Sequence, residues 1–372
     1  MKSSVKWVSS VVVAVCALLA SVQFAPAQTT ASSSAYVYLI NQLANNTSEL
    51  DGYRADINGS LTRLSGSPFW KSNSLYGSLA NTSHWLFASD GIYNYSFSIA
   101  SNGTLKKVSS INAQQYTGTT YTTVSYLTLD HTGSTLYALV SDGAGDNAIQ
   151  FFRKNSTTGA LAYFGSTPNS AAAGVPHFIG NDVYAYDAGC IQASRAWYAV
   201  RRGSGGTLTP FSIDPPLPTN PNADYCPDGS AVDPASNLAV ALLPNVQPPA
   251  QLAVYTADGL GNLTPKSTAE NMPTADVDLP YRLLASPAGN LLAIVGIKGL
   301  QVFHFNGSNP ITPYTGLIAA HTISDLAWDT HSHLYAIGSG RVNAFRVTTT
   351  GHKQAPGSPY AINAVAITVL SK

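Results

Sequence analysis

The sequence of 372 residues is poor in charged residues and nearly free of glutamate. Charged residues make up 10% of the chain, whereas an ordinary soluble domain carries about 25%. Glutamate occurs only at Glu49 and Glu270, and there are two methionines. Helical proteins draw heavily on Glu, Lys, Met and Leu, so this scarcity disfavours an all-helical or coiled-coil fold.

The chain also lacks an excess of charge of one sign. Its 19 lysines and arginines balance 19 aspartates and glutamates. A nucleic-acid-binding domain typically carries a strongly basic patch, so we expect no nucleic-acid partner. What the sequence has in abundance is 30 glycines, 22 prolines and 20 tyrosines within a 45% hydrophobic composition. This combination is typical of a folded β protein with many turns.

No hydrophobic run reaches the roughly 20 residues that a membrane span requires. The apolar run Val11–Ala20 follows Lys2 and Lys6 and precedes Ala25-Pro26-Ala27, which has the small-residue pattern of a secretory cleavage site. We therefore predict a signal peptide at residues 1–27. Its removal leaves 345 of the 372 residues, with 17 basic against 19 acidic side chains. We expect an exported protein, periplasmic or extracellular, with no membrane span after cleavage.

Cysteine is equally scarce. Cys16 lies in the apolar run, which leaves Cys190 and Cys226 in the mature chain. An even number in an oxidising compartment favours a disulfide, and two buried free thiols are the alternative. The bond would close a loop of 36 residues, worth about 3 to 4 kcal/mol on the chain-entropy model. No Cys-x-x-Cys pair occurs, and we expect neither a metal site nor a cofactor.

A turn followed by Leu-Thr or its equivalent recurs along the chain. Its seven copies begin at Asn58, Asn102, Thr158, Gly205, Leu260, Asn309 and Thr350. The mean spacing of about 49 residues matches one four-stranded blade of a propeller. In the third unit, alternating apolar residues predict strands at 124–130, 135–140, 148–153 and 160–165, and the fifth and sixth units repeat this order.

The two ends of the chain supply complementary strands. Ala35–Ile40 matches a second strand whose first strand is missing, and Ala364–Leu370 matches a spare first strand. Pairing the two would complete a blade and remove the unpaired edges of an open array. We therefore predict an all-β fold: one seven-bladed β-propeller of four-stranded blades over residues 28–372, as a monomer.

Several motifs resemble a known family. Tyr36-Val37-Tyr38, Gly59-Ser60-Leu61-Thr62 and Ser65-Gly66-Ser67-Pro68-Phe69 are similar to the pattern of the lactonase-type seven-bladed propellers, the 6-phosphogluconolactonase-like family. Pro356–Tyr360 repeats the last motif, and Leu284–Leu291 is similar to the family's Ser-Pro-Asp-Gly turn. The resemblance covers essentially the whole mature chain. It implies a propeller whose channel face opens or closes lactone rings with histidine, arginine and acidic side chains.

The resemblance also implies candidate catalytic residues. Pro176-His177 is similar to the family's Pro-His at the start of an innermost strand, and Asp187-Ala188-Gly189 to its Asp-x-Gly. Where the family commonly has Pro-Arg-His, this chain has Pro280-Tyr281-Arg282, and the family's downstream glutamate is absent. His177, Asp187 and Arg282 are therefore the catalytic candidates.

Propeller topology brings the starts of the first strands together at one mouth of the channel. By alignment these positions are Ser125, His177, Ser230, Arg282 and Asp325. We expect them to bind an anionic or polyol ligand, with His177 as general base and Arg282 stabilising an oxyanion. The cysteine pair would pin a proline-rich loop, Pro215–Pro227, beside this mouth as the specificity element.

Three functions are compatible with these features. The first is an exported, non-catalytic propeller that binds a small molecule, a glycan or a protein partner, which the missing Pro-Arg-His and glutamate favour. The second is a lactone hydrolase of altered specificity. The third is a purely structural surface-layer propeller, which would have a plugged channel.

Overall fold

The computed structural model describes residues 33–45, 47–74, 77–116, 123–141, 147–168, 174–180, 182–191, 194–218, 220 and 222–372. Residues 32–372 form one compact unit. The predicted signal peptide at 1–27 lies outside the described residues. Within the described part of the chain, nearly all regular structure is β, and the one helical turn is η1 (Gln114–Tyr116).

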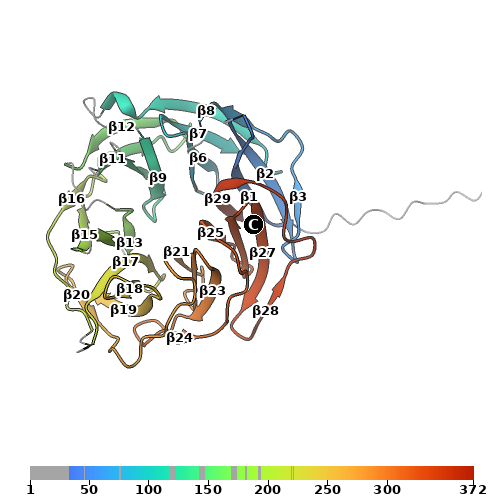
Figure 1. Cartoon of the computed structure of the whole chain (residues 1–372). Coiled ribbons are helices and arrows are strands. Elements are labelled where there is room, and N and C mark those ends of the chain that lie inside the picture. The colour runs from blue at the N-terminus through green and yellow to red at the C-terminus, as the bar shows by residue number, and fades with distance from the viewer. Residues whose placement is uncertain are drawn as a thin grey trace, which may run out of the picture. The chain divides into compact units, whose positions relative to one another are not determined.

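Seven antiparallel sheets follow one another in chain order, and Figure 1 shows them arranged around a ring. The first sheet contains β29 (Ala364–Ser371), β1 (Ser33–Gln42), β2 (Ser48–Asp56) and β3 (Leu61–Arg63), with β4 (Trp70–Ser72) also paired to β2. The second contains β5 (Ser78–Asn81), β6 (Trp85–Ser89), β7 (Tyr93–Ile99) and β8 (Leu105–Asn112). The third contains β9 (Thr123–Leu129), β10 (Thr135–Ser141), β11 (Asn147–Lys154) and β12 (Leu161–Ser166).

The remaining four sheets repeat the same order. The fourth contains β13 (His177–Ile179), β14 (Tyr184–Ile191), β15 (Ser194–Arg202) and β16 (Leu208–Pro210). The fifth contains β17 (Tyr225–Val232), β18 (Asn237–Pro244), β19 (Gln251–Ala257) and β20 (Leu263–Pro265). The sixth contains β21 (Pro280–Ala285), β22 (Leu291–Gly296), β23 (Gly299–His304) and β24 (Thr312–Pro313), and the seventh β25 (Asp325–Trp328), β26 (His333–Gly338), β27 (Arg341–Thr348) and β28 (Gly351–Gln354).

The two ends of the propeller meet in one blade. β29 pairs antiparallel with β1 from Ala35 opposite Ser371 to Asn41 opposite Ala364, and Figure 1 shows the red β29 beside the blue β1. β1 is thereby flanked by a strand on either side, since it also pairs with β2. The predicted seven-bladed propeller, with four-stranded blades and closure by the C-terminal strand, is confirmed.

The hydrophobic core lies between successive blades. The second strands are the most buried, and every residue of β22 and β26 is buried. One apolar cluster packs Val37 and Leu39 of the first blade against Tyr335 and Ile337 of the seventh. Burial of these faces accounts for the 45% hydrophobic composition and joins the first blade to the last.

A recurrent latch explains the turn motif of the repeat. On three second strands a buried tyrosine hydroxyl donates a hydrogen bond to a glycine carbonyl in the outer turn of the next blade. The pairs are Tyr38 with Gly103 at 2.9 Å, Tyr137 with Gly206 at 2.8 Å, and Tyr186 with Gly261 at 2.7 Å. Each glycine has a φ between 84° and 89°, a conformation that strongly favours glycine. The glycine of the repeat therefore serves both the turn and the contact between blades.

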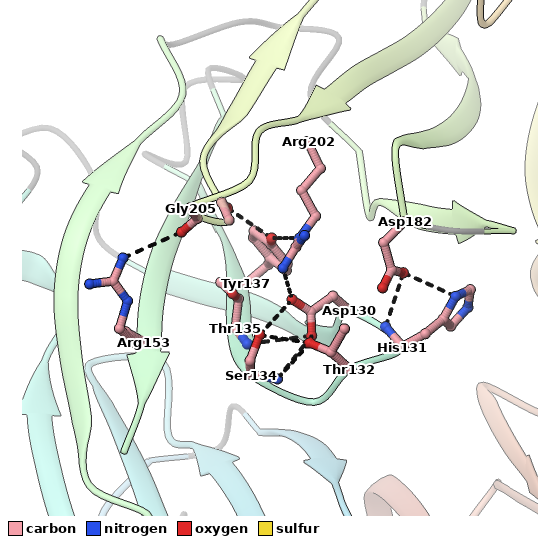
Figure 2. A network of polar contacts seen from close by, with 11 residues as sticks. Asp130, His131, Thr132, Ser134, Thr135, Tyr137, Arg153, Asp182, Arg202 and Gly205 are labelled. Atoms are coloured by element: carbon pink, nitrogen blue, oxygen red, sulfur yellow. Dashed lines mark hydrogen bonds and ion pairs between the residues drawn. The ribbon is translucent and has the colours of Figure 1, made fainter. Parts of the chain in front are cut away.

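Figure 2 shows an additional polar connection between the third and fourth blades. Arg202 donates to Asp130 at 2.5 Å and, through Nε, to the Tyr137 hydroxyl at 3.0 Å. Burial disfavours the Asp130 carboxylate, but hydrogen bonds from Thr132 and Arg202 together hold its pKa below the ordinary value. Asp130 thus caps the turn after β9 and ties it to the neighbouring blade.

Candidate functional site

The innermost strands form the wall of the central channel. β17, β21, β25, β29, β5 and β9 contact one another in this order around the ring. Arg282 on β21 donates from Nη1 to Oδ1 of Asp325 on β25 at 2.5 Å. Its guanidinium carbon also lies 4.9 Å from the ring centre of Tyr126 on β9. Because β9 belongs to the third blade and β21 to the sixth, Arg282 reaches across the channel.

The pair of Arg282 and Asp325 is partly shielded from solvent, with side-chain exposures of 24% and 15%. Burial lowers the pKa of Arg282, but Asp325 and Tyr126 together outweigh burial and raise that pKa overall. Burial also raises the pKa of Asp325, against the opposing effects of Arg282 and the Leu326 N–H, which donates at 2.8 Å. Nε of Arg282 is buried without a partner among the described residues. The site therefore has a neutralised ion pair, and the unpaired Nε beside it is shielded from solvent.

Asp187 on β14 is the second acid of the site. Its Oδ2 accepts the Val175 N–H at 2.8 Å, and its Oδ1 accepts the Ala188 N–H at 2.8 Å and the Ser230 hydroxyl at 3.3 Å. Burial nevertheless raises the pKa of Asp187 to about 7, with a further contribution from the charge of Asp228. Asp187 therefore exchanges its proton near neutral pH.

His177 at the start of β13 is uncharged at neutral pH. Burial lowers its pKa to about 4, and the positive charge of Arg282 adds to this effect. His177 lines a cavity of about 440 Å³ that extends along the ends of the first strands. The other walls come from β9, β17, β21 and the turns that follow them, including Thr128, His131, Val232, Leu284 and Pro287.

An oriented histidine stands at the rim of this cavity. The His131 backbone N–H donates to Oδ1 of Asp182 at 3.0 Å, and Nδ1 of the imidazole lies 3.0 Å from the same oxygen, as Figure 2 shows. Asp182 is buried and has a φ of 62°, which non-glycine residues rarely adopt. The strained turn thus presents a carboxylate that fixes His131 beside the cavity.

Cys190 and Cys226 form a disulfide between β14 and β17. The Cys190 N–H donates to the carboxylate of Asp228, whose pKa burial raises. Cys226 was expected within the proline-rich loop Pro215–Pro227 but lies in β17, because the strand continues through a bulge between Pro227 and Ser230 and so begins at Tyr225. Pro227, expected at the end of the proline-rich loop, is for the same reason part of β17.

The structure brings most of the predicted residues together. Arg282 bonds Asp325, Ser230 bonds Asp187, and His177 lies in the field of Arg282. Ser125 is exposed, and its hydroxyl donates to the Leu139 carbonyl at 3.2 Å rather than to this group.

Sequence reasoning missed Tyr126, Asp228 and His131. The sequence contains a signal that could have identified Tyr126. Tyr126 lies four residues before the side chain that caps the next turn, and the same is true of Arg282 and Asp325. Those side chains are Asp130, Ser286 and Asp329. Nothing comparable marks Asp228 or His131.

Neither a metal centre nor a membrane helix is found in the described part of the chain. No group of three or more histidine, cysteine, aspartate or glutamate side chains there is placed to hold a metal ion. No helix among the same residues has the length and apolar character that crossing a bilayer requires.

Solved structures similar to this chain include a gluconolactonase. The periplasmic gluconolactonase of Pseudomonas aeruginosa is 15% identical, covers 91% of this chain and 99% of its own, and superposes with a TM-score of 0.61. A protein from Bacteroides fragilis, provisionally named a 6-phosphogluconolactonase, is 12% identical over 92% of this chain and 99% of its own, with a TM-score of 0.62.

A protein of unknown function from Desulfotomaculum acetoxidans is 13% identical over 91% of this chain and 99% of its own, with a TM-score of 0.61. No protein-family model and no curated protein sequence matches the chain. At these identities the likeness shows the fold: the chain has the seven-bladed architecture of the lactonase-type structures, as its motifs indicated.

Proposed function

We propose that the channel binds a neutral, polyhydroxylated small molecule, of the kind represented by a sugar or a sugar lactone. The observation that carries the proposal is the position of Arg282, which spans the channel between Asp325 and Tyr126 beside His177 and Asp187. This arrangement gathers donors, acceptors and an aromatic face from different blades at one point.

The charges of these groups favour an uncharged ligand. Asp325 neutralises Arg282. His177 carries no charge at neutral pH, because its pKa is about 4. Asp187 has a pKa of about 7 and adds negative rather than positive charge. An anion such as a sugar phosphate would meet no uncompensated cation here, so of the two ligand classes expected from the sequence the polyol is favoured.

The chemistry of the lining suits hydroxyl groups. The protonated Asp187 is both a donor and an acceptor, as are the Tyr126 and Ser230 hydroxyls. Tyr126 also offers a ring face to the C–H groups of a sugar. His177 also borders a cavity of about 440 Å³ along the ends of the first strands, but the other residues of the proposed site do not line that cavity.

Lactone hydrolysis is the second candidate. In that case His177 would accept a proton from an attacking water, and Arg282 would stabilise the oxyanion of the opening ring. The fold shared with a gluconolactonase favours it, as does Asp187, whose carboxylate accepts the N–H of Val175, two residues before His177. A histidine with a pKa of about 4 is a weak base at neutral pH, and the guanidinium is already engaged by Asp325, so binding ranks above turnover.

Export belongs to the same proposal. The predicted signal peptide at 1–27 and the disulfide between Cys190 and Cys226 both fit an oxidising compartment, either the periplasm or the exterior of the cell. The disulfide in addition fixes β14, which carries Asp187, against β17, which carries Ser230.

Calorimetric titration of the mature protein with glucose, myo-inositol and gluconate at pH 7 tests the binding proposal. We expect the neutral polyols to bind in the micromolar to millimolar range and gluconate to bind more weakly. Arg282→Gln should weaken polyol binding by about tenfold, the effect of losing charged hydrogen bonds, whereas Arg341→Gln at an exposed arginine should not. Absence of binding by all three compounds would refute the proposal.

Turnover is measured separately with glucono-1,5-lactone at slightly acid pH, where spontaneous opening is slow. Hydrolysis that His177→Gln abolishes, with glucose binding retained, would establish the second candidate. No hydrolysis above the uncatalysed rate, with polyol binding present, would leave the protein as a binding propeller.

A further inference from the structure

A basic pocket lies on the outer edge of the propeller, where the seventh blade meets the first. Its volume is about 360 Å³. The outer strands β27 and β28 supply Arg346, His352, Lys353 and Gln354, and the turn between β2 and β3 supplies Asn58. No acidic residue lines it. The pocket is remote in the blade from the channel, because β25 is the innermost strand of that sheet and β28 the outermost.

The placement of the two fixed cations is costly for folding. Arg346 and Lys353 stand directly opposite each other in the antiparallel pair of β27 and β28, so both side chains project from the same face. Like charges in this relationship repel and destabilise a sheet. Both side chains are exposed, and within the described ranges neither makes an ion pair or a side-chain hydrogen bond. A ligand of opposite charge would remove this repulsion.

We propose that this pocket binds an oxyanion carried on a sugar-sized ligand, such as a sulfated or carboxylated saccharide. Arg346 and Lys353 would pair with the anion. Asn58 and Gln354 would hydrogen-bond neighbouring hydroxyl groups, since their amides are exposed at the pocket. The volume suits one or two sugar rings by comparison with known small-molecule sites.

The edge pocket carries uncompensated positive charge, whereas the ion pair in the channel is neutral. In the channel an arginine is neutralised by an aspartate on the adjacent blade, whereas at the edge two cations face each other without an acid. The two sites therefore select different ligands. The edge pocket does not depend on the proposed function of the channel, and each can be tested with the other intact.

Calorimetric titration of the mature protein at low salt, with a sulfated disaccharide and separately with inorganic sulfate, tests the proposal. We expect the disaccharide to bind and its affinity to fall as salt is raised, because ions screen exposed charges. The double variant Arg346→Gln/Lys353→Gln should bind it at least about tenfold more weakly. Lys106→Gln, at an exposed lysine of the second blade, is the matched control and should change nothing.

The two probes separate the sources of the anion. Disaccharide binding that is much tighter than sulfate binding supports a saccharide ligand, and equal affinities assign the pocket to a free anion. The proposal is overturned if neither the disaccharide nor sulfate binds, or if the double variant binds the disaccharide as tightly as the wild type does. The alternative is that the two cations only keep the exposed edge strand from pairing with other chains. In that case the double variant would aggregate but keep its affinity for the disaccharide. A cooperative urea unfolding transition checks that the variant is folded.

Discussion

Arg282 and Asp325 join the sixth and seventh blades by a hydrogen bond of 2.5 Å inside the channel, while the same guanidinium faces Tyr126 of the third blade. Side chains from three blades thus meet at one guanidinium. The pair has a structural effect, because it ties β21 to β25 on the channel wall. It also has a chemical effect, since it removes the positive charge that an anionic ligand would require.

Replacing Asp325 by Asn should therefore change both stability and selectivity. The charge of Arg282 would lose its partner in a partly buried position, which we expect to cost about 2 to 3 kcal/mol after allowance for partial exposure. The released cation should raise the affinity for gluconate relative to glucose. Urea unfolding and calorimetric titration measure the two effects, and Asp214→Asn, at an exposed aspartate, is the control.

A double variant separates the two contributions. Arg282→Gln together with Asp325→Asn removes both charges, so it should be less destabilised than the sum of the single variants. It should also show no gain in gluconate affinity. Strictly additive losses would mean that the pair contributes nothing beyond its separate side chains.

The sequence was sufficient for the fold because the fold is repeated. Seven copies of one turn, and two strands without partners at the ends, determined the number of blades and the manner of closure. Because each copy of the repeat can be compared with the others, a wrong boundary for one strand does not change the predicted number of blades. The tyrosine latches are visible only in three dimensions, because each joins residues 65 to 75 positions apart.

The site was less accessible to the same reasoning. Side chains alternate between the two faces of a strand. An error of one position in the alignment therefore selects a residue whose side chain points away from the channel. The alignment favours Ser125 over Tyr126 in this way, because Ser125 is the extra residue of a bulge in β9, between the pairs Val124–Val140 and Tyr126–Leu139. The pairing of Arg282 with Asp325 and the raised pKa of Asp187 depend on packing between blades, which no single strand encodes.

Reducing the disulfide should destabilise the propeller without unfolding it. Cys190 and Cys226 close a loop of 36 residues, which corresponds to about 3 to 4 kcal/mol on the chain-entropy model. The double variant Cys190→Ser/Cys226→Ser should show this loss in urea unfolding. A reductant should lower the stability of the wild type by a similar amount and leave the double variant unchanged. Equal stability of the oxidised wild type and the double variant would show that the bond adds no stability.

Loss of one latch should weaken the contact between the fourth and fifth blades. The buried Tyr186 hydroxyl donates to the Gly261 carbonyl at 2.7 Å, so Tyr186→Phe would leave that carbonyl without this donor. We expect a loss of about 1 to 2 kcal/mol in the free energy of unfolding. Tyr281→Phe is the control, because that side chain is 53% exposed and lies on a different strand. Equal effects of the two variants would show that the latch adds nothing measurable.

The pH dependence of stability should reveal two opposing groups in the channel. Asp187 has a pKa of about 7 in the folded protein, against about 3.9 in an unfolded chain. Its contribution is complete below about pH 4 and is lost as pH rises to about 7, because in this window the folded state holds the extra proton. His177 has a folded pKa of about 4, against about 6.5 unfolded, so its contribution grows as pH rises through the same range.

In the wild type these contributions largely cancel between about pH 4 and 6.5, and each single variant should expose the other group. Asp187→Asn leaves His177, so stability should rise with pH by up to about tenfold in the unfolding constant per pH unit. His177→Gln leaves Asp187, so stability should fall with pH at a similar rate. Other groups add the same background to every variant, and the double variant should return to the wild-type slope. Urea unfolding at pH 4.5, 5.5 and 6.5 measures the slopes, and slopes of the same sign in the two single variants would contradict the assignment.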